Sequence, residues 1–446
     1  MTLIEEALTK TTDTKACVIG SVATARAAEM FVSLFPKQRA VVVADTNTWA
    51  VAGQEVDARL RSAGVPTEPA FVFSDPELFA EWSYIEQLEA ALAKVDAVAV
   101  AVGSGVINDL CKLVSHRLGR RYMVVGTAAS MDGYTSYGAS ITKDGIKQTM
   151  SCPAPLGCIV DSKVAAEAPK ELVAAGYADL LAKVPAGADW ILADAIGSER
   201  IHDAAWKFVQ GPLRDSLSKP AACAAGDVAE TEKLCEGLVM SGFAMQAMGS
   251  SRPASGTEHQ FSHYWDMEGL CYGGKHVSHG FKVGIGTLAS TATIEFLLER
   301  DIANLDVDAC VKGWWPTFES LAATFPQVYG DRPAHIERAM SEMRGKYVAP
   351  EQLRGELESI KRMWPELSVR MRAQIMGFDE IRSALKAVGA PYEPEHIGIS
   401  RQRFRDTFAG IPYMRNRYFS LDLVSRLGLV PELLNRLFGK GGVWEC

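Results

Sequence analysis

The first 130 residues alternate short apolar runs with longer segments of helical periodicity, and this alternation limits the possible folds more than any other feature of the chain. The apolar runs are rich in β-branched residues and bounded by turn residues: ACVIG (16–20), AVVVAD (40–45), PAFVF (69–73), AVAVAVG (97–103) and YMVVGT (122–127). The pattern predicts an α/β domain in which helices cover both faces of a parallel sheet. Ligands of such sheets bind outside the carboxyl ends of the strands.

Two of these strand ends carry residues suited to a dinucleotide. The turn GSGVIND (103–109) joins a strand to a helix start, where backbone N–H groups and the helix dipole suit a pyrophosphate. It lacks the GxGxxG pattern, so an ordinary tight turn is the alternative. Asp45, at the end of AVVVAD, is placed to accept hydrogen bonds from adenosine ribose hydroxyls and to disfavour a 2′-phosphate. Its alternative role is that of a helix N-cap.

The composition changes over residues 128–160, which are rich in Ser, Thr, Gly and Ala. The Asp-Gly pair at 144–145 predicts a β-hairpin around residues 143–145. Asp132 lies in a loop just past a strand end, where its carboxylate could bond a substrate hydroxyl. Ordinary turn chemistry is the alternative explanation for a loop Asp.

From Ser162 onward helical patterns dominate. Asp179 lies in the helical segment AGYADLLAK among small and apolar residues. A carboxylate on such a buried helix face needs a partner, and a metal ion would supply one.

Four of the eight histidines fall between Ser250 and Gly286. His259 and His263 are four residues apart in a predicted helix and therefore share a face, and a Gly-rich turn can return His279 to the same point. Two imidazoles and one carboxylate would leave positions open for substrate on zinc or a ferrous-type ion. Surface histidines on a polar helix are the alternative, because neither HExxH nor CxxC is present.

Composition and charge narrow the class of partner. The chain has 446 residues, of which 48% are hydrophobic, enough for large cores in two or three domains. A net charge of −8 without a Lys/Arg run argues against nucleic acid or an anionic membrane surface and favours a small molecule. We expect a cytoplasmic protein, since the acidic N-terminus lacks an apolar leader, no stretch approaches the roughly 18 apolar residues of a membrane span, and the nine cysteines show no pairing pattern.

Six separate stretches, in order, resemble the bacterial and archaeal sn-glycerol-1-phosphate dehydrogenases. They are GSGVINDLCK, GTAASMDGYTSYGAS, AGYADLLAK, SRPASGTEHQFSH, HGFKVGIG and YMRNRYFSLDL. This family belongs to one superfamily with glycerol dehydrogenase, iron-dependent alcohol dehydrogenases and dehydroquinate synthase. The similarity runs from about Val41 to Leu423.

The resemblance implies a dehydroquinate synthase-like fold, in which residues 1–161 form a Rossmann-like α/β dinucleotide-binding domain and residues 162–446 an all-helical metal- and substrate-binding domain. By motif, the implied metal ligands are Asp179, His259 and His279, which makes His263 a neighbour of the metal instead of a ligand. Asp132 matches the position that contacts substrate. The implied contacts to NAD, or alternatively NADP, are Asp45, Gly103, Ser104, Gly105, Asn108, Asp109, Thr127 and Ser130. Many superfamily members have three glycines where this chain has Gly-Ser-Gly.

The implied reaction interconverts dihydroxyacetone phosphate and sn-glycerol 1-phosphate by hydride transfer with NAD(P)H. The divalent ion, zinc or nickel ahead of iron, would polarise the C2 carbonyl. We hypothesise that a proton arrives through water linked to His263, whose ordinary pKa suits relay near neutral pH. Arg252, seven residues before His259, is our candidate for binding the phosphate, with a structural loop arginine as the alternative. The superfamily also suggests a dimer or larger homo-oligomer.

Three alternatives remain. One is a glycerol or other polyol dehydrogenase with the same metal and cofactor. The second is a cyclase of the dehydroquinate synthase type, which would show no net consumption of NADH. The third is a catalytically silent metal- or nucleotide-binding protein, which a complete set of Asp132, Asp179, His259 and His279 argues against.

Overall fold

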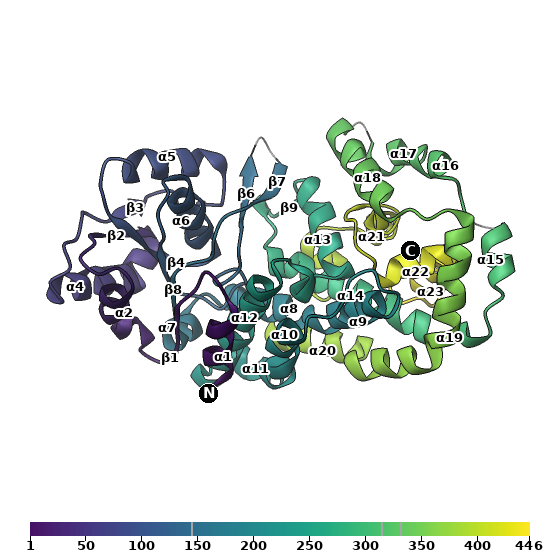
Figure 1. Ribbon diagram of the computed structural model, residues 1–446, viewed down its shortest axis with the longest axis horizontal. Coiled ribbons are helices and arrows are strands. Elements are labelled where there is room, and N and C mark those ends of the chain that lie inside the picture. Colours follow the sequence, from purple (N-terminus) through teal and green to yellow (C-terminus); the bar gives the residue numbers. More distant parts are fainter. Residues whose placement is uncertain (144–145, 314, 331) are drawn as a thin grey trace. The chain divides into compact units, whose positions relative to one another are not determined.

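The computed structural model describes residues 1–143, 146–313, 315–330 and 332–446 (Figure 1). Contacts divide the chain into two compact units. Unit 1 contains residues 1–180, 203–254 and 387–390, and unit 2 contains residues 181–202, 255–386 and 391–446.

Unit 1 contains a six-stranded sheet in the order β1-β8-β5-β4-β2-β3, and every neighbouring pair of strands is parallel. The strands are β1 (Ala16–Gly20), β2 (Ala40–Asp45), β3 (Phe71–Phe73), β4 (Val98–Gly103), β5 (Met123–Gly126) and β8 (Gly157–Asp161). The first five coincide with the predicted runs to within two residues at each end. Strand β8 was missed, because GCIVD follows a segment rich in Ser, Thr, Gly and Ala that had been predicted as loop and hairpin.

The helices of unit 1 include α1 (Leu3–Lys10), α2 (Ala27–Leu34), α3 (Thr46–Thr48), α4 (Gln54–Ser62), α5 (Trp82–Leu92), α6 (Gly105–Arg117), α7 (Ser162–Glu167), α8 (Lys170–Leu181), α10 (Asp203–Ser216), α11 (Pro220–Ala225), α12 (Val228–Met248) and the short η3 (Arg252–Ala254). One core cluster joins the sheet to α2 and α4 through residues such as Phe31, Val56, Val100 and Ile159. Burial of these apolar side chains is the main force that holds the layers together.

The predicted hairpin is present as β6 (Ala139–Lys143) and β7 (Ile146–Met150), which pair antiparallel with Lys143 opposite Ile146. Its predicted turn at Asp144 and Gly145 lies outside the described residues.

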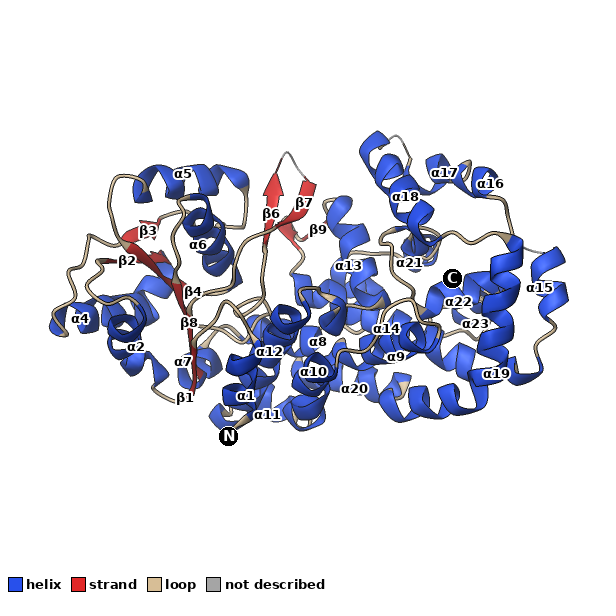
Figure 2. Cartoon of the chain, viewed as in Figure 1, coloured by secondary structure: helices blue, strands red, loops and turns tan. Residues whose placement is uncertain are grey.

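In the described part of unit 2 the strands are confined to the short hairpin of β9 (Cys271–Tyr272) and β10 (Lys275–His276), and helices make up the rest of its regular structure (Figure 2). The helices are α9 (Lys183–Ala195), α13 (Thr257–Met267), α14 (His279–Leu298), α15 (Val307–Gly313), α16 (Phe318–Ala322), α17 (Phe325–Tyr329), α18 (Pro333–Lys346), α19 (Pro350–Gln374), α20 (Phe378–Val388), α21 (Arg401–Thr407), α22 (Ser420–Arg426) and α23 (Val430–Phe438). The prediction of a parallel-sheet α/β region followed by helices is therefore confirmed. The functional boundary at residues 161 and 162 stays a prediction; the last strand of the sheet ends at Asp161.

By length and composition helix α14 could be a membrane span, although no such stretch was expected from the sequence. However, 89% of its most apolar 18-residue stretch is buried inside the protein. A core helix has these properties, so the finding is weak evidence for a membrane segment.

Candidate active site

The three predicted metal ligands lie together. Asp179 near the end of α8, His259 in α13 and His279 at the start of α14 each offer one ligand atom, and these atoms are within 4.8 Å of one another. Asp179 is completely buried and His259 is nearly so. One carboxylate and two imidazoles are a donor set that zinc and other divalent first-row metals accept.

Glu258 orients His259, and sequence analysis missed it. This buried carboxylate accepts a hydrogen bond from the backbone N–H of Gly256 at 2.6 Å, and the same oxygen, Oε1, is 2.8 Å from Nδ1 of His259. A proton on Nδ1 donated to Glu258 leaves Nε2 of His259 with its lone pair for a metal. In the sequence, this role could have been suspected because an acidic residue directly precedes a candidate metal ligand.

A similar contact orients His279. The Ser262 hydroxyl lies 3.3 Å from Nδ1 of His279, and Ser278 caps the helix that His279 begins by accepting a hydrogen bond from the Phe281 N–H. Both imidazoles thus have a partner on their Nδ1 side. Such partners fix the ring orientation and leave the Nε2 side available for ligation.

The helices that carry the histidines pack very closely. A Cβ atom added to Gly286 of α14 would lie 2.2 Å from the carbonyl oxygen of Glu258 in α13. Asp189 of α9 holds the start of α13 by accepting a hydrogen bond from the Thr257 N–H at 2.8 Å, and its other oxygen accepts one from the Ser420 N–H at 2.7 Å. The positions of the two ligands are therefore set by backbone contacts as well as by side chains.

His263 lies beside the ligands, as expected, but its protonation differs from the expectation. Its ring centroid is 6.3 Å from that of His259 and 6.5 Å from that of His279. Burial, with a smaller contribution from Arg415, lowers the pKa of His263 well below its usual range. The inference from an ordinary imidazole pKa was therefore wrong, because spacing in a sequence does not reveal desolvation.

Lys282 of α14 is held within unit 2. Its ammonium donates to Asp266 at 2.5 Å and to the carbonyl of Val277 at 2.9 Å.

Asp132 lies beside a predicted metal ligand. Its backbone N–H donates to Oδ2 of Asp179 at 3.1 Å, and its own Oδ2 accepts a hydrogen bond from the Ser241 hydroxyl at 2.9 Å. Ser241 is a completely buried residue of α12 that sequence analysis did not single out, because nothing local in the sequence indicates its contact with residue 132.

The predicted phosphate-binding turn has the expected geometry of strand, turn and helix. Strand β4 ends at Gly103, Ser104 is the N-cap residue, and α6 begins at Gly105. The turn is tightly packed: a Cβ on Gly103 would lie 2.7 Å from the Ile107 side chain, and one on Gly105 would lie 3.1 Å from Met131. Thr127 lies next to the turn and donates its N–H to the carbonyl of Gly103 at 3.1 Å.

Ser130, the other predicted cofactor contact past β5, is partly exposed in the loop before Asp132. The cofactor contacts of the turn, of Thr127 and of Ser130 stay predictions.

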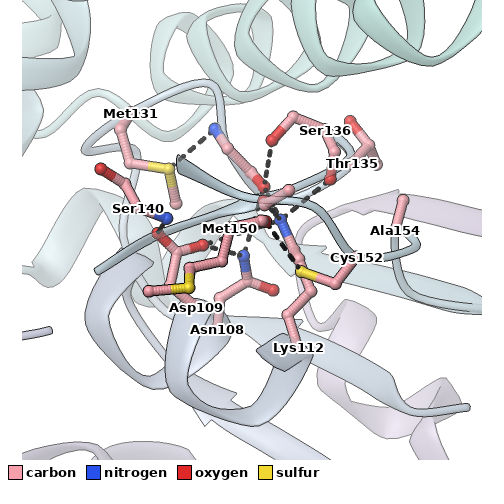
Figure 3. Close-up of polar contacts among 12 residues, drawn as sticks. Asn108, Asp109, Lys112, Met131, Thr135, Ser136, Ser140, Met150, Cys152 and Ala154 are labelled. Atoms are coloured by element: carbon pink, nitrogen blue, oxygen red, sulfur yellow. Dashed lines mark hydrogen bonds and ion pairs between the residues drawn. The ribbon is translucent and has the colours of Figure 1, made fainter. Parts of the chain in front are cut away.

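Asn108 and Asp109 face the 133–140 segment (Figure 3). The buried Asn108 accepts a hydrogen bond from the Tyr122 hydroxyl at 2.8 Å and donates to the carbonyl of Gly133 at 3.2 Å. Asp109 accepts from the Ser140 N–H at 3.0 Å, and burial raises the pKa of its carboxyl. These bonds give both side chains a structural role, and their predicted contact with the cofactor stays untested.

Asp45 serves as a helix cap. Its Oδ1 accepts hydrogen bonds from the N–H groups of Asn47 and Thr48, both at 2.8 Å, at the start of α3. The N-cap alternative is thus present in the structure, and the ribose contact stays a prediction.

Arg252, the predicted phosphate contact, is completely buried at the start of η3. Its backbone N–H donates to the Ser250 hydroxyl at 3.2 Å. Its role toward a phosphate stays a prediction.

Solved structures of low identity share the fold. Glycerol dehydrogenase from Schizosaccharomyces pombe has a TM-score of 0.59 at 16% identity and covers 96% of this chain and 91% of its own. Maleylacetate reductase from Agrobacterium tumefaciens has a TM-score of 0.60 at 14% identity and covers 97% of both chains. At these identities the likeness establishes the fold alone.

Sequence relatives define the family. Residues 18–169 match the family described as iron-containing alcohol dehydrogenase. The glycerol-1-phosphate dehydrogenase, NAD(P)+, of Halalkalibacterium halodurans is 37% identical over 253 residues, a match that covers 56% of this chain and 63%, less than two thirds, of that relative. The protein of the same name from Geobacillus thermodenitrificans is 31% identical over 328 residues, and this match covers 71% of this chain and 80% of the relative. The one from Bacillus licheniformis is 27% identical over 429 residues, and its match covers 95% of this chain and 92% of the relative. The chain therefore belongs to the NAD(P)-dependent glycerol-1-phosphate dehydrogenase family of oxidoreductases.

Proposed function

We propose that this protein interconverts dihydroxyacetone phosphate and sn-glycerol 1-phosphate with NAD(P)H as the hydride donor. The observation that carries the proposal is the group formed by Asp179, His259 and His279, with Asp132 hydrogen-bonded to Asp179, in a chain of this family. The silent-binding alternative has no support from this set, because the residues that would act on substrate and metal are present together.

Asp179, His259 and His279 are proposed to hold one divalent metal ion. Their donor atoms fit such an ion in type and mutual distance, and Glu258 turns His259 so that Nε2 is available. We propose zinc or nickel ahead of iron, since two imidazoles suit these borderline metals. When bound, the ion would supply Lewis-acid polarisation of a substrate carbonyl.

The cofactor is proposed to bind at the carboxyl ends of the sheet strands, over the turn formed by Gly103, Ser104 and Gly105, with Asn108, Asp109, Thr127 and Ser130 around it. The N-terminus of α6 supplies N–H groups and a positive dipole end for a pyrophosphate. Asp45 ends the neighbouring strand β2, and its negative charge favours NADH over NADPH. Bound NAD(P)H would supply the hydride.

The substrate is proposed to be oriented by Asp132, which accepts a hydrogen bond from a substrate hydroxyl, and by Arg252, whose guanidinium can pair with two phosphate oxygens. Reduction of the C2 carbonyl adds one proton to its oxygen. His263 is the proposed proton relay. Its lowered pKa keeps the imidazole neutral near neutral pH, and a neutral imidazole donates at one nitrogen and accepts at the other.

The decisive experiment compares NADH oxidation with dihydroxyacetone phosphate and with unphosphorylated dihydroxyacetone, using protein of known metal content. A kcat/KM at least about 100-fold higher for the phosphate is expected. Equal activity with both substrates would favour a glycerol or polyol dehydrogenase. Absence of oxidation with either substrate would contradict the proposal and leave the cyclase alternative, which turns over without net loss of NADH.

We further propose a cytoplasmic location, a role of the product in phospholipid metabolism and a homo-oligomeric state, dimeric or larger. All nine cysteines are free thiols, which supports a reducing compartment. Metal- and cofactor-loaded protein in analytical ultracentrifugation tests the oligomer, and a sedimentation mass of one chain would contradict it.

A further inference from the structure

Lys112 is a completely buried lysine on α6 whose ammonium group is enclosed by backbone oxygens. It donates to the carbonyl of Gly133 at 3.0 Å, to that of Ser136 at 2.9 Å and to that of Gly138 at 3.0 Å (Figure 3). An ammonium has three N–H donors, and these three bonds use all of them. The carboxylate of Asp109 is 3.6 Å from the ammonium nitrogen.

This arrangement makes the 133–138 loop depend on one charge. Three carbonyl oxygens that point to the same place repel one another unless a cation lies between them. A buried ammonium in turn is tolerated only when its donors are satisfied. The lysine and the loop conformation therefore stabilise each other, and removing the charge would release the loop.

Helix α12 also holds this part of the chain. Thr135 donates its hydroxyl to the carbonyl of Val239 at 2.7 Å, and Ser241 donates its hydroxyl to the carboxylate of Asp132 at 2.9 Å. The fit is tight, because a Cβ on Gly242 would lie 2.2 Å from the Thr135 hydroxyl oxygen and 2.9 Å from the carbonyl of Asp132.

We propose that Lys112 and Ser241 are positioning residues that together hold Asp132 in place. Lys112 fixes the backbone that follows Asp132, and Ser241 fixes the direction of its carboxylate. The inference rests on the proposed function, in which Asp132 contacts the substrate. Neither residue needs to touch the substrate for this role, and a displacement of about 1 Å at a substrate-orienting group is enough to slow a reaction on the order of 100-fold.

The first test is a double-mutant cycle between Ser241→Ala and Asp132→Ala, measured as kcat/KM for dihydroxyacetone phosphate with a saturating concentration of NADH. Ser241→Ala alone is expected to lower kcat/KM about 10- to 100-fold. In the Asp132→Ala background, which has no acceptor for the Ser241 hydroxyl, the same change is expected to have less than about a threefold effect, because Ser241 acts through the carboxylate. Equal losses in both backgrounds, or no loss in either, would overturn the assignment of Ser241.

The second test is Lys112→Met, which keeps the length of the side chain and removes its charge. We expect a loss of about 100-fold in kcat/KM for the substrate, with the dissociation constant for NADH within about threefold of the parent protein. Val56→Ala, in the core cluster of α2 and α4, is the control for general destabilisation and is expected to keep both constants. A Lys112→Met chain that binds NADH and turns over normally, or one that fails to fold, would overturn the positioning role of Lys112.

These variants also separate the inference from the proposed function. If Asp132→Ala retains full activity, Asp132 does not contact the substrate and that part of the proposed function fails. If Asp132→Ala is impaired while Ser241→Ala and Lys112→Met are not, the proposed function stands and the positioning inference fails.

Discussion

Replacement of Gly286 by alanine tests whether the close packing of α13 and α14 sets the metal site. The added Cβ would lie 2.2 Å from the carbonyl oxygen, 3.0 Å from the carbonyl carbon and 3.1 Å from the Cα atom of Glu258. These are backbone atoms inside a helix, so no side-chain rotation can relieve the contact. Ordinary contact begins near 3.4 Å, so the two helices must separate locally by about 1 Å.

The size of the effect follows from two opposing contributions. Overpacking of this kind costs about 1–3 kcal/mol, whereas alanine is favoured over glycine within a helix by roughly 0.5–1 kcal/mol. We therefore expect a net loss of up to about 2.5 kcal/mol in the stability of the metal-free protein. His259 directly follows Glu258, and His279 begins the helix that carries Gly286, so separation of the helices also moves the two imidazoles apart. A metal affinity weakened at least about tenfold is expected.

Metal affinity is measured by calorimetric titration of the metal-free protein with zinc or nickel. Stability is measured by thermal unfolding of the metal-free form. Gly355→Ala is the matched control. Gly355 also lies inside a helix, α19, and a Cβ there would meet no heavy atom within 4 Å. The control is expected to gain roughly 0.5–1 kcal/mol from helix propensity and to bind metal like the parent. If Gly286→Ala unfolds and binds metal like Gly355→Ala, close packing of these helices does not set the site.

Four further predictions follow from the site. Asp179→Ala and His259→Ala should each remove the metal and the activity, because a three-ligand site that loses one ligand cannot hold the ion. Metal analysis of the purified variants checks this. Full activity of the parent protein in the presence of a strong chelator would contradict it. Glu258→Ala should weaken metal affinity about 10- to 100-fold by freeing the His259 ring, measured by competition with a metal indicator; an unchanged affinity would show that the contact is dispensable. Asp45→Ser should reduce the preference for NADH over NADPH, since serine can still cap α3 but carries no charge. Equal kcat/KM for both cofactors in the parent protein would show that Asp45 does not select the cofactor. Arg252→Ala should reduce kcat/KM about 10- to 150-fold for dihydroxyacetone phosphate and much less for dihydroxyacetone, while the metal content stays unchanged. Equal losses of kcat/KM with the two substrates would show that Arg252 has a structural role.

The fold could be predicted because its signal is local. The apolar runs at 16–20 and 40–45 match β1 and β2 residue for residue, since each is a short β-branched stretch bounded by turn residues. Strand β8 could not be separated from the segment before it, which is rich in Ser, Thr, Gly and Ala. Its place between β1 and β5 depends on pairing with strands far away in the sequence, and no local pattern reports this.

The candidate site could be predicted only as far as residue types and spacing allow. The four-residue spacing of His259 and His263 placed both on one helix face as candidates. The family resemblance then selected His259 as the ligand, with Asp179 and His279, and made His263 a neighbour. The lowered pKa of His263, by contrast, depends on burial by the folded chain.

The contacts of Lys112 and Ser241 also escaped the sequence analysis. Each joins residues more than twenty positions apart in the chain. A polar residue on an apolar helix shows that some partner must exist, but it does not say which one.

The backbone N–H of Asp132 donates a hydrogen bond to Oδ2 of Asp179. This bond links the ordering of the loop that contains Asp132 to metal binding at Asp179. If an ordered loop favours the ligating rotamer of Asp179, then metal binding must favour the ordered loop by the same free energy, because linkage is reciprocal. Metal affinity should therefore be higher in the presence of a bound substrate analogue, and substrate affinity should rise by the same factor when metal binds. Measured in both directions, this factor gives the coupling energy between the two sites.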